Sequence, residues 1–115
     1  MVRDDGQRLD DVLAAAEAIA THLRRGTLDD GLVFDAVRVR LIEIGEAVKA
    51  IDPELLARES SVPWQDIAGM RDHPAHRYFD TDHALLAATV DRDLPHLVDA
   101  VRRLRADGDD RAIDD

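Results

Sequence analysis

The chain has 115 residues, enough for one domain with a single core. Hydrophobic residues make up 45% of it and aromatic residues only 3%, so the core must be aliphatic, which suits a helix bundle. The absence of cysteine excludes disulfides, Cys-based zinc sites and thiol catalysis. The formal net charge of −10 argues against a broad, non-specific nucleic-acid binder, because such binding depends on phosphate neutralisation.

Neither end of the chain resembles a membrane or export signal. No apolar run approaches the roughly 20 residues that cross a bilayer. The first residues lack the apolar stretch of a signal peptide, so we predict a cytoplasmic protein. Residues 107–115 hold five aspartates against one arginine and little to bury. We therefore predict one helical domain over residues 1–106 and a disordered acidic tail over 107–115.

Three long segments carry apolar residues at steps of three and four, the pattern of amphipathic helices. The first covers about 8–25 and ends before Gly26. The second covers about 31–51, and Gly45 beside its apolar stripe predicts a close neighbouring helix. The third covers about 82–105, and Pro95 is expected to kink or split it.

Two short helices are expected between the second and third long ones. Asp52 and Pro53 have the residue types of a cap and a first helical position, and another short helix covers about 64–70. Together these elements predict an all-α, up-and-down bundle of about four main helices plus short helices.

Residues 71–78 gather groups that stability alone does not require: two arginines, an aspartate, two histidines and a tyrosine. His76 has the side chain whose proton moves most easily near neutral pH. Arg71 stays cationic and can hold a phosphate through two hydrogen bonds. These two groups suffice for metal-free RNA cleavage, in which a base deprotonates a 2′-hydroxyl and a cation stabilises the attacked phosphate.

The spacing of these two residues constrains their geometry. Five positions on one straight helix turn Arg71 and His76 about 140° apart. Either the chain bends between them, as Pro74 allows, or two subunits pool their copies. If Pro74 begins a helix, His76 lies in its first turn, where the positive helix end favours a neutral imidazole.

The sequence has Arg71 followed, after four residues, by His76-Arg77-Tyr78. This spacing resembles the Arg-x4-His-x-Tyr signature of the HEPN superfamily, in its HepT-like (DUF86) toxin branch. Residues 44–47, Ile-Gly-Glu-Ala, resemble the glycine–glutamate–alanine stretch of that family's second long helix. Residues 63–71 resemble its proline–tryptophan lead-in to the catalytic arginine, and residues 93–97 resemble its late helix. The resemblance covers about residues 8–104.

The resemblance implies a HEPN-like α-helical homodimer with its active site at the dimer interface. It implies a metal-independent endoribonuclease toxin of a type VII-like toxin–antitoxin system that needs no cofactor. A cognate minimal nucleotidyltransferase antitoxin would neutralise it by transferring AMP to Tyr78. Arg71 would stabilise the phosphate, His76 would be the acid and base, and Asp72 would orient the site. The family often has asparagine in place of Asp72 and aliphatic residues near Pro74.

Other interpretations of the same residues stay open. The histidines, the arginine and Tyr78 are also residue types that serve as surface, ion-paired or core side chains. His73 and His76, with acidic neighbours, suggest a metal site, but Pro74 breaks the helical spacing that such a site would use. A second hypothesis is a non-catalytic helical module that binds nucleotides or a nucleotidyltransferase. The sequence does not reveal the RNA target, the cleavage site, the modification state of Tyr78 or assembly beyond a dimer.

Overall fold

The computed structural model describes residues 3–69, 84 and 86–114. All regular elements in these ranges are helical, which confirms the predicted all-α bundle. The long helices are α1 (Asp5–Arg25), α2 (Gly31–Ala50) and α6 (Leu94–Asp114). The shorter elements are α3 (Pro53–Leu56), the 3₁₀ helix η1 (Ala57–Glu59), α4 (Trp64–Gly69) and the π-helical segment η3 (Thr89–Asp93). None of the described helices is long and apolar enough to cross a membrane.

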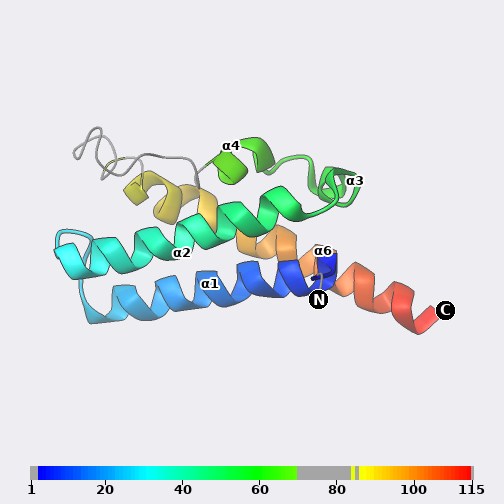
Figure 1. The fold of residues 1–115 in the computed structure, drawn as a ribbon, viewed down its shortest axis with the longest axis horizontal. Helices are drawn as coiled ribbons and strands as arrows, with labels where there is room; N and C mark the ends of the chain where they lie inside the picture. The colour runs from blue at the N-terminus through cyan, green and yellow to red at the C-terminus, as the bar shows by residue number, and fades with distance from the viewer. Residues whose placement is uncertain (1–2, 70–83, 85, 115) are drawn as a thin grey trace.

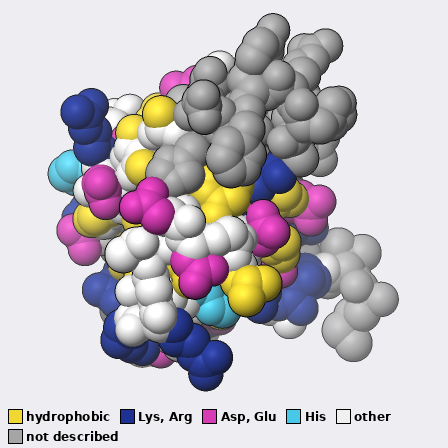
Figure 2. Space-filling view, turned by 90° about the vertical axis from the view of Figure 1, so that its left-hand side faces the viewer, with side chains coloured by type: hydrophobic (Ala, Val, Ile, Leu, Met, Phe, Trp, Pro, Cys, Tyr) yellow, Lys and Arg dark blue, Asp and Glu magenta, His cyan; other side chains and the backbone are white. Residues whose placement is uncertain are grey.

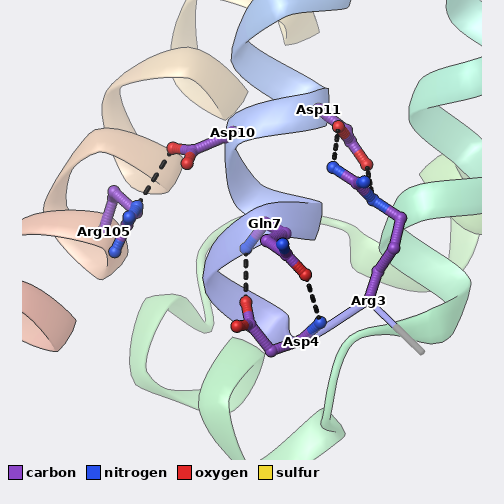
Figure 3. Close-up of polar contacts among 6 residues, drawn as sticks. All are labelled: Arg3, Asp4, Gln7, Asp10, Asp11 and Arg105. Carbon is purple, nitrogen blue, oxygen red and sulfur yellow. Dashed lines mark hydrogen bonds and ion pairs between the residues drawn. The ribbon is translucent and has the colours of Figure 1, made fainter. Parts of the chain in front are cut away.

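Helix α1 begins and ends where its flanking residues dictate. The Asp4 carboxylate accepts a hydrogen bond from the Gln7 backbone N–H, and the Gln7 side chain accepts one from the Asp4 N–H (Figure 3). Arg24 and Arg25 lie in the last turn, where cations favour the negative helix end, and Gly26 follows. The helix therefore begins three residues before its predicted start and ends as predicted.

Helix α2 lies antiparallel beside α1 and supplies the centre of the core (Figure 1). The Asp30 side chain caps its first turn by accepting the Leu32 N–H. Gly45 is buried, as expected for a glycine at a packed helix surface. All the predicted apolar residues of this stripe are buried: Val33, Val37, Leu41, Ile44, Val48 and Ile51.

Helix α6 packs against α1, and its buried side chains complete the hydrophobic core (Figure 1). The predicted interruption at Pro95 falls in the turn before it. There the Leu94 N–H bonds the Thr89 carbonyl, five residues back, within the π-helical segment. Because Pro95 has no N–H to bond the Asp91 carbonyl, this wider turn accommodates it and the chain continues as one helical path.

The last helix extends past residue 106, where the sequence predicts the folded domain to end. Helix α6 continues through Asp114, and its end extends beyond the other helices (Figure 1). The division into a domain over 1–106 and a tail stays a prediction.

We expect Ile44→Ala to destabilise the bundle by about 2–5 kcal/mol, since it leaves a cavity in a closed core. Ile44 is 0% exposed on the inner face of α2. Leu32→Ala is the matched control, because Leu32 is 83% exposed on the same helix. Urea unfolding monitored by circular dichroism measures both variants. Equal midpoints for the two variants would contradict the described packing.

Candidate functional site

The residues predicted to carry the chemistry, Arg71, Asp72, His76 and Tyr78, lie outside the described residues. Their roles therefore stay predictions. The structure does describe the elements that flank this segment in the sequence. Helix α4 ends at Gly69, two residues before Arg71, and helical structure is described again at residue 84 and from Leu86 onward.

Helix α4 is fixed to the body of the protein by its apolar face. Ile67 is buried and Trp64 is half-buried against the same core cluster. The helix packs against α2 (Figure 1). The Ile67 N–H donates to the Pro63 carbonyl at 3.1 Å, which closes the first turn. The lead-in to Arg71 is therefore a short helix attached to α2.

Glu59, at the end of η1, connects the start of α4 to α6. Its backbone carbonyl accepts the Trp64 indole N–H at 3.0 Å and the Val62 N–H at 3.2 Å. Its carboxylate Oε1 accepts from Arg103 Nη2 at 2.6 Å and Nε at 3.0 Å. One residue thus links α4 to α6 and fixes the edge of the indole ring.

The arginine of this link is cationic across the ordinary pH range. The hydrogen bond to Glu59 is the main cause that raises the pKa of Arg103, and the negative charges of Glu59 and Asp99 raise it further. The Glu59 side chain is only 18% exposed. Arg103 therefore stays cationic and available to hold Glu59.

The chain that follows the candidate segment is anchored by apolar contacts. Leu86 is buried, and Val90 of η3 is partly buried against the core. Leu97 on α6 is 2% exposed in the same cluster. Both described ends of the candidate segment are therefore held by the one core.

A groove of about 600 Å³ opens beside the start of α4, between the ends of α2, α3 and α4. Trp64 and Pro63 form part of its wall, and Lys49 from the last turn of α2 lies on another side. Gln65 and Asp66 add polar groups. Lys49 makes no ion pair with any other residue that the structure describes.

Several other cations in the described ranges are already paired with carboxylates. Arg3 Nη2 lies 2.7 Å from Asp11 Oδ1, and Arg105 Nε lies 3.0 Å from Asp10 Oδ1 (Figure 3). The end view in Figure 2 likewise shows acidic and basic side chains interspersed, with apolar atoms between them.

The described ranges contain no group of three His, Asp or Glu side chains placed to hold a metal ion. His73 and His76, which raised a metal site in the sequence, lie outside these ranges. His22 and His96 are described, but neither belongs to a ligand cluster.

Sequence reasoning missed Glu59 and Lys49. Glu59 stands in a polar turn and its partner Arg103 follows 44 residues later, so no local pattern pairs them. Lys49 reads as an ordinary basic residue in a last helical turn. The one available signal is that Lys49 is the sole lysine of the sequence.

Trp64→Phe is expected to lower the free energy of unfolding by about 0.5–1.5 kcal/mol, the net value of one hydrogen bond. Phenylalanine keeps most of the ring contacts but cannot donate to the Glu59 carbonyl. Urea unfolding followed by circular dichroism measures the change, since the variant has no other tryptophan to report by fluorescence. A variant as stable as the parent would mean that the indole N–H contributes nothing to the anchor.

Comparison with known proteins places the chain in a family. The model of the HepT-like family, described as "Ribonuclease HepT-like", matches residues 9–104. A "Probable ribonuclease HepT" of Thermococcus cleftensis is 33% identical over 109 residues, covering 91% of this chain and 99% of that protein. A "Putative RNase" of Caldanaerobacter subterraneus subsp. tengcongensis is 32% identical over 100 residues, covering 84% and 89%. No solved structure matches the chain significantly.

The family match runs from α1 through the buried part of α6 and spans the candidate segment between α4 and η3. It agrees with the resemblance found in the ordered set of sequence motifs. The chain belongs to the HepT-like ribonuclease family.

Proposed function

We propose that the protein is a metal-independent endoribonuclease, the toxin of a two-gene toxin–antitoxin pair. The observation that carries this proposal is the family match over residues 9–104, which includes Arg71 and His76. The described framework supports it, because α4 and the start of the last helical path are anchored at both ends of that segment.

In the proposed reaction His76 removes the proton from a ribose 2′-hydroxyl. The 2′-oxygen attacks the adjacent phosphorus, and the bond from phosphorus to the 5′-oxygen breaks. Arg71 stabilises the negative charge that develops on the phosphate oxygens. The leaving 5′-oxygen takes a proton from an imidazolium, so the products are a 2′,3′-cyclic phosphate and a 5′-hydroxyl. Asp72 orients the site.

The protein acts as a homodimer in this proposal, and the Arg71 and His76 copies of both subunits face one RNA strand. Two subunits resolve the spacing problem, since five helical positions turn these residues about 140° apart. The site would need no metal or cofactor. RNA and the ATP required for inactivation are both cytoplasmic, which is where we place the protein.

The partner in this proposal is a minimal nucleotidyltransferase antitoxin. The Tyr78 hydroxyl oxygen would attack the α-phosphorus of ATP, releasing diphosphate and leaving AMP on the ring oxygen. Bulk and negative charge beside Arg71 and His76 would then exclude RNA and repel its phosphates.

The end groups of the products test the mechanism. The purified protein should convert RNA into fragments with 2′,3′-cyclic phosphates and 5′-hydroxyls, read by mass spectrometry. An oligonucleotide with one 2′-deoxy residue at the cleavage site should stay intact there. Fragments with 5′-phosphates would contradict attack by the 2′-hydroxyl.

The second candidate is a non-catalytic module that binds nucleotides or a nucleotidyltransferase through the same segment. The net charge of −10 favours it, because an acidic chain repels RNA. Binding of the nucleotidyltransferase with no cleavage of RNA by the unmodified protein would select this candidate.

A further inference from the structure

The groove at the start of α4 combines three features that one class of ligand would use together. Its wall includes an aromatic ring, Trp64, and a cation, Lys49. Its other polar lining includes Gln65 and Asp66, so the charges of Lys49 and Asp66 balance. The rest of the lining is mostly apolar, so the groove offers an aromatic side chain for base stacking and one cation for one phosphate, rather than a track for a run of phosphates.

The indole ring is held in place for such a ligand. Trp64 is half-buried, and its N–H is bonded to the Glu59 carbonyl at 3.0 Å. Arg103 holds the Glu59 carboxylate in turn. The ring therefore does not need its own hydrogen-bond donor to be satisfied by a ligand, and its orientation costs little to maintain on binding.

The groove is also close in sequence to the proposed catalytic residues. Trp64 begins α4, and Gly69 ends it about 7.5 Å further along the axis. Arg71 follows two residues later. Within the proposed function, this closeness along the chain makes a nucleotide of the bound RNA the candidate occupant of the groove.

We infer that this groove, the α4 groove, is a nucleotide subsite in which an unpaired base of single-stranded RNA stacks on Trp64 and its phosphate meets Lys49. This inference rests on the proposed function, whose substrate it specifies as single-stranded. It explains how a chain with a net charge of −10 engages RNA: stacking on an aromatic ring is sequence-tolerant and needs few phosphate contacts.

The sequence contains one tryptophan and one lysine, so the test is unusually specific. The probe is a fully 2′-O-methylated single-stranded oligoribonucleotide, which lacks the attacking hydroxyl and so reports binding without cleavage. Binding is followed twice, by anisotropy of a labelled oligonucleotide and by intrinsic emission of Trp64. We expect Trp64 emission to be quenched along the same binding curve as the anisotropy.

Three variants and a control separate the contributions. Trp64→Leu should weaken binding about tenfold, whereas Trp64→Phe keeps a ring and should weaken it less. Lys49→Gln should weaken binding and lower the salt slope by about 0.7, the value for one phosphate of a single strand. Arg102→Gln is the control: it removes the same charge from a different groove, between α1 and α6, and should change nothing beyond bulk charge.

Two results would overturn the inference without touching the ribonuclease proposal. One is RNA binding by anisotropy with unchanged Trp64 emission and equal effects of Lys49→Gln and Arg102→Gln. The other is Trp64 emission that changes with protein concentration but not when RNA is added, which would mean that a second copy of the protein covers the groove. Absence of any binding also overturns the inference, and cleavage of ordinary RNA by the same preparation then shows whether the ribonuclease proposal fails with it.

Discussion

His76→Ala is expected to lower the rate of RNA cleavage by about 10²–10⁴-fold, the usual contribution of a general acid and base. Alanine cannot take the 2′-hydroxyl proton or return one to the leaving oxygen. The measurement is the single-turnover rate with saturating protein over a labelled RNA, so that weaker binding does not contribute. The loss of cleavage should be the same with and without a metal chelator, because no metal ion replaces the imidazole.

His96→Ala is the matched control for this substitution. His96 is exposed on α6 and belongs to no described ligand cluster, so its loss should leave the rate unchanged. Circular dichroism and size-exclusion chromatography must show that both variants keep the parent fold and assembly. Cleavage by His76→Ala at the parent rate would remove His76 from the mechanism.

Arg71→Ala should cost about 10²–10³-fold in the same assay, as loss of one preorganised donor to a developing oxyanion does. Arg71→Lys should recover only part of that loss, since an ammonium keeps the charge but not the two-pronged geometry.

Tyr78→Phe is expected to abolish modification by the nucleotidyltransferase while leaving RNA cleavage largely intact. The sequence has one tyrosine, so intact-mass spectrometry reads the result directly: the parent gains one AMP group and the variant gains none. The variant should therefore still cleave RNA after incubation with the nucleotidyltransferase and ATP, whereas the parent should lose its cleavage activity.

Two other outcomes would revise the role of Tyr78. AMP on the Tyr78→Phe variant would place the modification on another residue. Loss of cleavage in an unmodified, folded variant would make Tyr78 part of the catalytic machinery. Parent protein incubated with the nucleotidyltransferase but without ATP is the control that separates modification from simple complex formation.

The long helices could be predicted from sequence because their apolar stripes are unbroken and their caps are local. Val37, Ile44 and Val48 are buried as their spacing indicated, and Asp30 and Asp52 cap α2 and α3. The predicted start of α1, at about residue 8, is three residues after the actual one, because the capping box of Asp4 and Gln7 precedes the first apolar residue of the stripe.

Features that depend on distant contacts or on small energy differences were harder to predict. Pro95 indicated an interruption, but a proline alone does not specify whether the chain kinks, breaks or widens into the π-helical turn observed at residues 89–93. The sequence beyond residue 106 is acidic and contains a glycine, so it gives no helical pattern from which the bounds of α6 could be read. The Glu59–Arg103 link joins residues 44 apart, which no periodicity encodes.

The candidate site was predictable as residue types and not as geometry. Arg71, Asp72, His76 and Tyr78 were singled out because their chemistry exceeds what stability needs, and their arrangement in space stays a prediction. The α4 groove was not foreseen, because Lys49 and Trp64 come from separate elements brought together by the packing of α4 on α2.

The most direct test of the central proposal is RNA cleavage by the purified protein in excess EDTA, after intact mass has shown that Tyr78 carries no AMP. A folded His76→Ala sample serves beside it. We expect the parent to cut RNA in EDTA and the variant to leave it intact, which would establish a metal-independent ribonuclease that uses His76. Failure of the folded, unmodified parent to cut any RNA pool would contradict the proposal and favour the non-catalytic binding module.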